Sequence, residues 1–449
     1  MSDQIRLKKG LDLPIAGVAL CAVTKRVAPG LVVVKPTDFR GMVPRLLVKE
    51  GDSVKAGSPL FADKKVAEMV FCSPVSGTVD AIVRGDKRKL LEVRVKADGK
   101  NESVAFDVPK IASLDKQGMT TLLLGCGLWP CIKQRPYGTV ADPQAEPKSI
   151  FISGMNTAPL GADPEFALKD DFDAIQAGVE ALGRLSKGGV HLSLPARNFA
   201  GNELHKLTGV IFHQFEGPHP AGNVGVQINH ISPINKGEVV WTVSLPWVAA
   251  IGRLFLKGVY DTHRTIAVAG PAAVNPSYVE VPAGVCMKDL AEYFGEGDLR
   301  IISGDVLTGE AVGPEGFLGF FHDQVSVIKE GKYFEMFGWA NPFRAKKFSA
   351  SRAYPAFLRC KKKYDMDTNE NGGERAFLMN DVYGKVFPMD IYPLQLFKAC
   401  LAGDLDKMEN LGMYEVLEED VALCEYVCPS KVEIQKIVRE GIELMMKEL

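Results

Sequence analysis

The pattern of hydrophobic and polar positions changes along the chain, and its first part is typical of an all-β module. Between residues 35 and 96, short runs of valine and leucine are separated by turn signals that contain glycine and proline. Residues 50–60 and 72–79 have the spacing of the biotinyl/lipoyl carrier fold, whose glycines supply positive φ at the turns. We therefore predict a biotinyl/lipoyl-like barrel-sandwich domain over residues 35–100.

The next part of the chain alternates between β-like runs and helix-like stretches, which favours an α/β unit. A helix is predicted over residues 171–185, because apolar residues recur there on one helical face. The β-like runs cover residues 121–124, 149–153, 210–212 and 239–243. This alternation predicts an α/β domain over residues 101–260.

Residues 261–449 show two further patterns. β-rich runs around one predicted helix at residues 287–294 indicate a small α+β module over residues 261–335. Helical periodicity predicts a C-terminal helical domain over residues 376–449, with helices at 393–402, 404–411 and 432–449. Residues 1–34 are expected to be interleaved with these domains. The predicted fold class is therefore α/β and multi-domain.

Composition narrows the class of protein. With 46% hydrophobic and 24% charged residues, the 449-residue chain is typical of a globular protein. The net charge of −2 argues against a general nucleic-acid binder. No apolar run reaches the roughly 18 residues that span a bilayer, and the best candidate, residues 245–256, contains Pro246 and Arg253. Nine scattered cysteines favour free thiols in a reducing compartment.

Charge is distributed unevenly near the C-terminus. Residues 341–364, here called the basic segment, hold eight basic and no acidic residues and lie in a predicted connector over residues 336–375. Residues 365–449 hold 18 acidic and 8 basic residues, a net of −10. Basic residues interleaved with aromatic ones suit an anionic headgroup layer, an RNA or an acidic protein surface. The open alternative is that the basic segment pairs with the chain's own acidic tail.

Two groups of residues are candidates for ligand or metal binding. Residues 125–133 form a Gly-x-Gly-x-x-Pro-x-x-Lys loop after a β-like run, and such loops let backbone amides approach a phosphate. The second group is four histidines whose spacing matches no zinc signature, so a surface or hydrogen-bonded role is expected. These histidines are His205, His213, His219 and His230.

Together these motifs resemble a known family. The order of barrel, Gly-x-Gly loop, later module with motifs at residues 281–284 and 303–305, and helical domain with Cys428-Pro429 is similar to that of the A subunit of the bacterial Na⁺-translocating NADH:quinone reductase. An electron-transport subunit of the Rnf complex and the flavin subunit of complex I are related to it. The resemblance implies a Rossmann-like α/β domain over residues 101–260 and a β-grasp (SLBB-like) module over residues 261–335. Residues 5–17 are also similar to the start of this family, so the resemblance covers essentially the whole chain.

Differences from the flavin- and cluster-binding relatives determine the expected cofactors. Trp129 adds bulk to a loop that must approach phosphate closely, so no FMN is expected. Cys424 and Cys428 match the last two ligands of a four-iron motif, but Glu418 and Val421 stand where the first two belong. We therefore expect no iron–sulfur cluster and no metal. Lys64 resembles a lipoyl acceptor only superficially, so no covalent lipoate or biotin is expected.

The resemblance implies a function within a larger assembly. The chain is expected to be a peripheral subunit on the cytoplasmic face of the bacterial inner membrane, in a complex that couples NADH oxidation and quinone reduction to Na⁺ export. Its expected partners are the other subunits and quinone, with membrane-surface contact through residues 341–364 and no nucleic acid. The isolated chain is not expected to be catalytic.

A quinone site needs an apolar groove with one or two polar donors, and the degenerate loop offers candidates for it if the old flavin cleft persists. The alternatives are that these residues plug the cleft or face a partner. Two other functions stay open: an Rnf-type electron-transfer subunit with flavin or iron–sulfur, and a docking subunit whose interface is the basic segment. The candidate quinone-binding residues are Gly125, Gly127, Trp129, Lys133, Arg135 and Tyr137.

Overall fold

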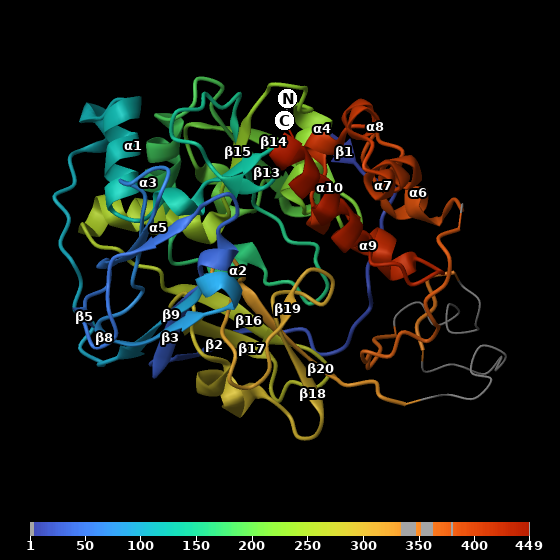
Figure 1. Cartoon of the computed structure of the whole chain (residues 1–449), viewed down its shortest axis with the longest axis horizontal. Helices are drawn as coiled ribbons and strands as arrows, with labels where there is room; N and C mark the ends of the chain where they lie inside the picture. The colour runs from blue at the N-terminus through green and yellow to red at the C-terminus, as the bar shows by residue number, and fades with distance from the viewer. Residues whose placement is uncertain (1–3, 334–346, 352–361, 379, 449) are drawn as a thin grey trace.

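The computed structural model describes residues 4–333, 347–351, 362–378 and 380–448. In Figure 1, the blue strands of the N-terminal barrel lie beside a central sheet, a second large sheet lies below it, and the red C-terminal helices pack on the right. The prediction of a mixed α/β fold with several domains is confirmed at this level.

Two small antiparallel sheets form the barrel, with strand orders β3-β9-β8-β5 and β4-β6-β7. Val93 and Val95 of β9 are fully buried, as a period of two requires of a strand with one face in the core. Phe61 of β6 stacks on Phe71 of β7 with ring centroids 4.7 Å apart. The strands are β3 (Leu31–Val34), β4 (Pro44–Leu46), β5 (Ser53–Val54), β6 (Pro59–Asp63), β7 (Val70–Cys72), β8 (Gly77–Arg84) and β9 (Leu90–Ala97).

The central sheet has the order β1-β14-β13-β12-β15-β10-β11. Its first five strands are parallel, and β10 and β11 extend it in the antiparallel sense. The strands predicted at 149–153, 210–212 and 239–243 are confirmed as β12, β14 and β15. The strands are β1 (Gln4–Arg6), β10 (Lys133–Arg135), β11 (Thr139–Val140), β12 (Ile150–Ser153), β13 (Val190–Pro195), β14 (Val210–Glu216) and β15 (Val240–Thr242).

Two helices beside this sheet approach each other unusually closely. They are α3 (Phe172–Gly183), which confirms the predicted helix, and α5 (Leu245–Lys257). A Cβ on Gly178 would lie 2.1 Å from the carbonyl oxygen of Val248, and one on Gly252 would lie 1.7 Å from that of Ala174. Glycine is therefore required at both positions of the contact. Two further helices of this region are α2 (Pro164–Ala167) and α4 (Val224–Ile231).

The β-like run predicted at residues 121–124 is wrong, because these residues lie in helix α1 (Lys116–Gly125). Asp115 caps the helix by accepting a 2.8 Å hydrogen bond from the amide of Gly118. Met119 and Leu123 point into the core at helical spacing, whereas the short leucine run by itself carries no period. The candidate loop therefore follows a helix, not a strand.

The second large sheet has the order β19-β18-β20-β16-β17-β2. The N-terminal segment contributes to both large sheets, since β1 pairs with β14 and β2 pairs with β17, each in parallel. The predicted helix at 287–294 is a 3-10 helix at Met287–Tyr293. The strands are β2 (Leu20–Arg26), β16 (Arg264–Ala269), β17 (Ser277–Val281), β18 (Leu299–Ser303), β19 (Glu310–Ala311) and β20 (Gln324–Lys329).

In the described part of residues 380–448, five α-helices share an apolar core. Cys424 and Cys428 lie at the end of α9, where the hydroxyl of Tyr383 is 3.1 Å from Sγ of Cys428. The predicted helix at 432–449 corresponds to α10, which begins at Ile434, so Pro429 precedes it and lies outside its first turn. The helices are α6 (Val382–Val386), α7 (Pro393–Ala402), α8 (Leu405–Asn410), α9 (Glu418–Val427) and α10 (Ile434–Glu448). Among the described residues, no helix combines the length and apolarity needed to cross a membrane.

Candidate functional site

A cavity of about 590 Å³ lies where the central sheet, the second sheet and the C-terminal helices meet. It is open at the carboxyl ends of the parallel strands, because the segments that follow β12, β14 and β15 all line it. Ligands of open α/β sheets bind outside these strand ends. The volume is in the range of small-molecule sites. The cavity is therefore the candidate functional site of the described residues.

Strand β10 brings two cationic side chains to the cavity. Lys133 and Arg135 are two residues apart, so a strand directs them to the same face, and both line the cavity. The ammonium of Lys133 lies 3.8 Å from the ring centroid of Phe321. Burial lowers the pKa of Lys133 from its ordinary value. This wall thus presents a cation held over an aromatic ring.

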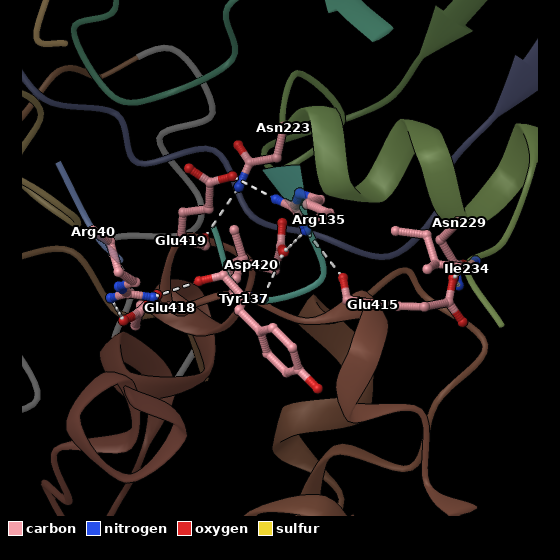
Figure 2. A network of polar contacts seen from close by, with 11 residues as sticks. Arg40, Arg135, Tyr137, Asn223, Asn229, Ile234, Glu415, Glu418, Glu419 and Asp420 are labelled. Atoms are coloured by element: carbon pink, nitrogen blue, oxygen red, sulfur yellow. Dashed lines mark hydrogen bonds and ion pairs between the residues drawn. The ribbon is translucent and has the colours of Figure 1, made fainter. Parts of the chain in front are cut away.

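Arg135 is held in a network of carboxylates from helix α9 (Figure 2). Its Nη1 donates to Oδ2 of Asp420 at 3.0 Å, and its Nη2 donates to Oε1 of Glu419 at 2.6 Å. A further bond runs from Nη1 to the backbone carbonyl of Glu415 at 3.0 Å. Burial raises the pKa of Asp420, and the Arg135 guanidinium opposes that rise. Arg135 therefore fixes the start of α9 against the sheet.

Two more contacts extend this network along the rim of the cavity. The guanidinium of Arg40 pairs with Glu418 and donates to the backbone carbonyl of Tyr137 at 2.9 Å. The side chain of Asn223 donates to the backbone carbonyl of Glu419 at 3.0 Å, and Figure 2 shows it beside Arg135. These bonds join the N-terminal barrel, the α4 side of the sheet and helix α9 into one wall.

The segment 319–324 also lines the cavity, next to Lys133, and several contacts hold it in place. Asp38 accepts a 2.8 Å bond from the amide of Phe320, and Arg264 donates to the carbonyl of Phe320 at 2.6 Å. The ring of Phe320 stacks on Trp247 with centroids 4.3 Å apart. Burial raises the pKa of Asp38 and that of Asp323. These contacts hold the 319–324 segment in one conformation.

His322 lies in the same segment. Its Nδ1 is 2.8 Å from the hydroxyl of Ser303, and that hydroxyl also accepts the amide of Gly319. Burial lowers the pKa of His322 to about 4, so the imidazole is neutral at physiological pH.

His219 occupies the loop between β14 and α4 and is 3% exposed. Its Nδ1 lies 3.1 Å from Oγ1 of Thr157, while its Nε2 is buried without a hydrogen-bond partner among the described residues. Burial lowers its pKa. The other three histidines of the sequence group lie elsewhere: His213 pairs with His191 at 2.8 Å, His205 packs on Phe199, and His230 bonds the carbonyl of Val226.

The sequence-predicted site residues divide into two sets. Lys133 and Arg135 line the cavity, whereas Gly125, Gly127, Trp129 and Tyr137 are absent from its lining. Trp129 is fully buried, donates its indole N–H to the carbonyl of Ala141 at 2.8 Å and packs edge-on against Trp241. The loop between Trp129 and α1 thus serves core packing.

The amides of this loop are engaged inside the chain. Gly127 donates to the carbonyl of Leu124 and Leu128 donates to that of Leu123, in the manner of a helix C-terminus. A Cβ on Gly127, which has φ of +74°, would lie 2.5 Å from Sγ of Cys72. Glycine here permits close packing on the barrel, and these amides do not face an anion. Among the described residues, no group of three or more His, Cys, Asp and Glu is placed to hold a metal.

Comparison with known proteins identifies the family. The chain matches the profiles of the NqrA N-terminal barrel-sandwich hybrid domain over residues 5–98, the NqrA second alpha/beta domain over residues 114–260 and the NQRA C-terminal domain over residues 265–313. A barrel-sandwich hybrid joined to an α/β domain thus defines the class.

Curated relatives match along the whole length. The A subunit of the Na⁺-translocating NADH-quinone reductase of Klebsiella pneumoniae is 40% identical over 99% of this chain and 100% of its own. That of Vibrio atlanticus is 38% identical over the same shares, and that of Rhodopirellula baltica is 38% identical over 99% and 98%. A chain of a solved NAD⁺-reducing NiFe-hydrogenase covers 76% of this chain and 64% of that chain at 13% identity and a TM-score of 0.37.

The chain belongs to the NqrA family, the A subunits of the Na⁺-translocating NADH-quinone reductase. The predicted family and the predicted enzyme class, a component of a Na⁺-transporting NADH:quinone reductase, are confirmed.

Proposed function

We propose that this chain is a peripheral, cytoplasmic-side subunit of a membrane complex that couples NADH oxidation and quinone reduction to Na⁺ export, and that it binds quinone in the 590 Å³ cavity. Its partners are then the other subunits of that complex. The names of the relatives support membership of a Na⁺-translocating NADH-quinone reductase. The proposal keeps the division into a barrel at 35–100, a Rossmann-like domain at 101–260, a β-grasp module at 261–335 and a helical domain at 376–449.

The observation that carries the quinone proposal is the pairing of Lys133 with Phe321 inside the cavity. A quinone is planar and largely apolar, with carbonyl oxygens that accept hydrogen bonds. Phe320 and Phe321 supply aromatic surface for such a ring, and the Lys133 ammonium is a donor within the same space. The cavity lining mixes charged and apolar side chains, and Phe320 and Phe321 belong to its apolar part.

The same proposal assigns the chain no flavin and no iron–sulfur cluster. The loop amides that would cradle a phosphate donate to carbonyls within the chain. Glu418, at a ligand position of the cluster motif, is paired with Arg40, and Cys428 contacts Tyr383. An Rnf-type electron-transfer subunit would require these groups to be free for a cofactor.

A docking role through the basic segment is the second candidate, supported by its charge pattern. Most of this segment, including Arg344 and Lys346, lies outside the described residues. Reversing the charge of Arg344, Lys346 and Lys347 together should release the protein from the complex or from anionic vesicles if the segment docks. Unchanged assembly and vesicle binding would contradict a docking role.

Equilibrium dialysis of the purified chain against a short-chain ubiquinone tests the quinone proposal. We expect saturable binding by a protein that has no visible absorption and no iron or zinc. Lys133→Met should weaken binding, whereas Lys187→Met, whose side chain is 91% exposed and outside the cavity, should bind like the wild type. A flavin or cluster spectrum, or no quinone binding by the wild type, would contradict the proposal.

A further inference from the structure

Among the described residues, the backbone amide, the backbone carbonyl and Nδ1 of His219 each have a hydrogen-bond partner, whereas Nε2 has none. Its backbone amide donates to Oδ1 of Asp12 at 2.9 Å, and its carbonyl accepts the amide of Leu11 at 2.8 Å. The ring is held through Nδ1 by Thr157. His219 is among the residues that line the cavity, and it is almost wholly buried. Its orientation is therefore set before any ligand arrives.

The hydrogen bonds of Thr157 favour one tautomer of His219. Oγ1 of Thr157 accepts a 2.9 Å bond from the amide of Gly222. The threonine hydroxyl has one proton, and Nδ1 of His219 at 3.1 Å is the acceptor available to it among the described residues. Nδ1 is then an acceptor, so the proton of the neutral imidazole resides on Nε2. The atom without a partner is therefore an N–H donor.

A buried donor without an acceptor destabilises the protein, and such groups in native structures usually serve a ligand or a water. The charged groups around His219 restrict which kind of ligand atom can accept a hydrogen bond from Nε2. The carboxylates of Asp12, Asp305 and Glu419 all act electrostatically on the ring. A further anionic oxygen placed here would be repelled by them, whereas a neutral carbonyl oxygen would not.

We propose that the Nε2–H of His219 donates to a carbonyl oxygen of a neutral, planar ligand in the cavity, and thereby fixes the orientation of the quinone ring. This inference rests on the proposed quinone site. It assigns the cavity two donors, Lys133 on β10 and His219 on the loop before α4. The two donors lie on different segments of the cavity lining, so each is a candidate donor to one carbonyl group of the ring.

The test compares four full-length proteins in the same dialysis experiment: wild type, His219→Phe, His219→Gln and His230→Phe. Phenylalanine keeps a planar ring but removes the donor, and glutamine restores an N–H. His230 is exposed on α4 and is the matched control. We expect His219→Phe to bind ubiquinone about tenfold more weakly, which is the effect of one lost hydrogen bond, and His219→Gln to recover part of the affinity.

An infrared measurement separates a donor from a packing residue. In the wild type, the carbonyl band of bound quinone should lie at lower frequency than that of free quinone, and His219→Phe should return one carbonyl toward the free position. Equal affinity and an unchanged band in His219→Phe would overturn the inference while leaving the quinone site intact. Absence of binding by the wild type would overturn the proposed function as well.

Two further results would also overturn the inference. Binding of inorganic phosphate that is lost in His219→Phe would show that the acceptor is an anion. A high-resolution structure of the quinone-saturated protein with a water molecule on Nε2 would show that solvent, not the ligand, satisfies the donor.

Discussion

The guanidinium of Arg135 donates to the carboxylate of Asp420 at 3.0 Å, although 285 residues separate the two along the chain. This pair joins strand β10 of the central sheet to helix α9 of the C-terminal part. Both side chains are almost fully buried. One wall of the cavity therefore depends on a buried ion pair between segments that are remote in sequence.

Removing one member of this buried ion pair should lower the free energy of unfolding. Arg135→Met leaves the carboxylate of Asp420 buried and unpaired, so we expect a loss of about 3–5 kcal/mol in the free energy of unfolding, measured with urea. The control Arg439→Met removes an ion pair with Glu418 whose arginine is 57% exposed, and it should cost about 1 kcal/mol or less. A similar small loss in both variants would contradict the role assigned to Arg135.

The contact between α3 and α5 gives a second prediction. Gly252→Ala would place a methyl group 1.7 Å from the carbonyl oxygen of Ala174, so the helices must separate. We expect a destabilisation of about 1–3 kcal/mol or more, seen as a lower Tm. Gly183→Ala, at the end of α3 with no atom within 4 Å of the new Cβ, should be neutral or slightly stabilising. Equal Tm values for the two variants would refute the close contact.

The buried imidazole of His322 predicts a pH dependence of stability. Its pKa is lowered from 6.5 to about 4 by burial, so between these values the unfolded chain binds a proton that the folded chain does not. The stability that His322 contributes is complete above pH 6.5 and is lost as the pH falls toward 4. Urea unfolding at about pH 7 and about pH 4.5 should therefore show a smaller difference for His322→Gln than for the wild type. Identical differences would contradict this.

Tryptophan fluorescence should report on the cavity through one residue. Neither Trp247 nor Trp129 is among the lining residues, but Trp247 stacks on Phe320, which lines the cavity, whereas Trp129 packs edge-on against Trp241. Quenching by bound ubiquinone should therefore be largely lost in Trp247→Phe and largely kept in Trp129→Phe. The reverse result would place the quinone at the loop of residues 125–133, where the sequence motif predicts the site.

The sequence predicted elements that one local pattern determines. The apolar stripe of residues 171–185 is found in α3, and the predicted helix at 393–402 matches α7. The prediction failed at residues 121–124, where a run of leucines has no period and the deciding signal is the cap at Asp115. The barrel and the family were recognisable because several motifs occur in a fixed order.

Most of the candidate site could not be predicted from local patterns. Lys133 and Arg135 were found because they follow the loop motif. His219 was noticed only as one of four histidines, and Asp38 was not singled out. The contact of Asp38 with Phe320 spans 282 residues, so no spacing along the chain reveals it. Such a site depends on tertiary packing of three separate parts of the fold.

The most direct test of the central claim is a crystal structure of the chain grown with ubiquinone at a concentration that saturates it in dialysis. We predict density for one quinone ring in the cavity, with one carbonyl within hydrogen-bond distance of Lys133 and the other within that distance of Nε2 of His219. An unoccupied cavity in the saturated protein, or a quinone bound elsewhere on the chain, would contradict the account.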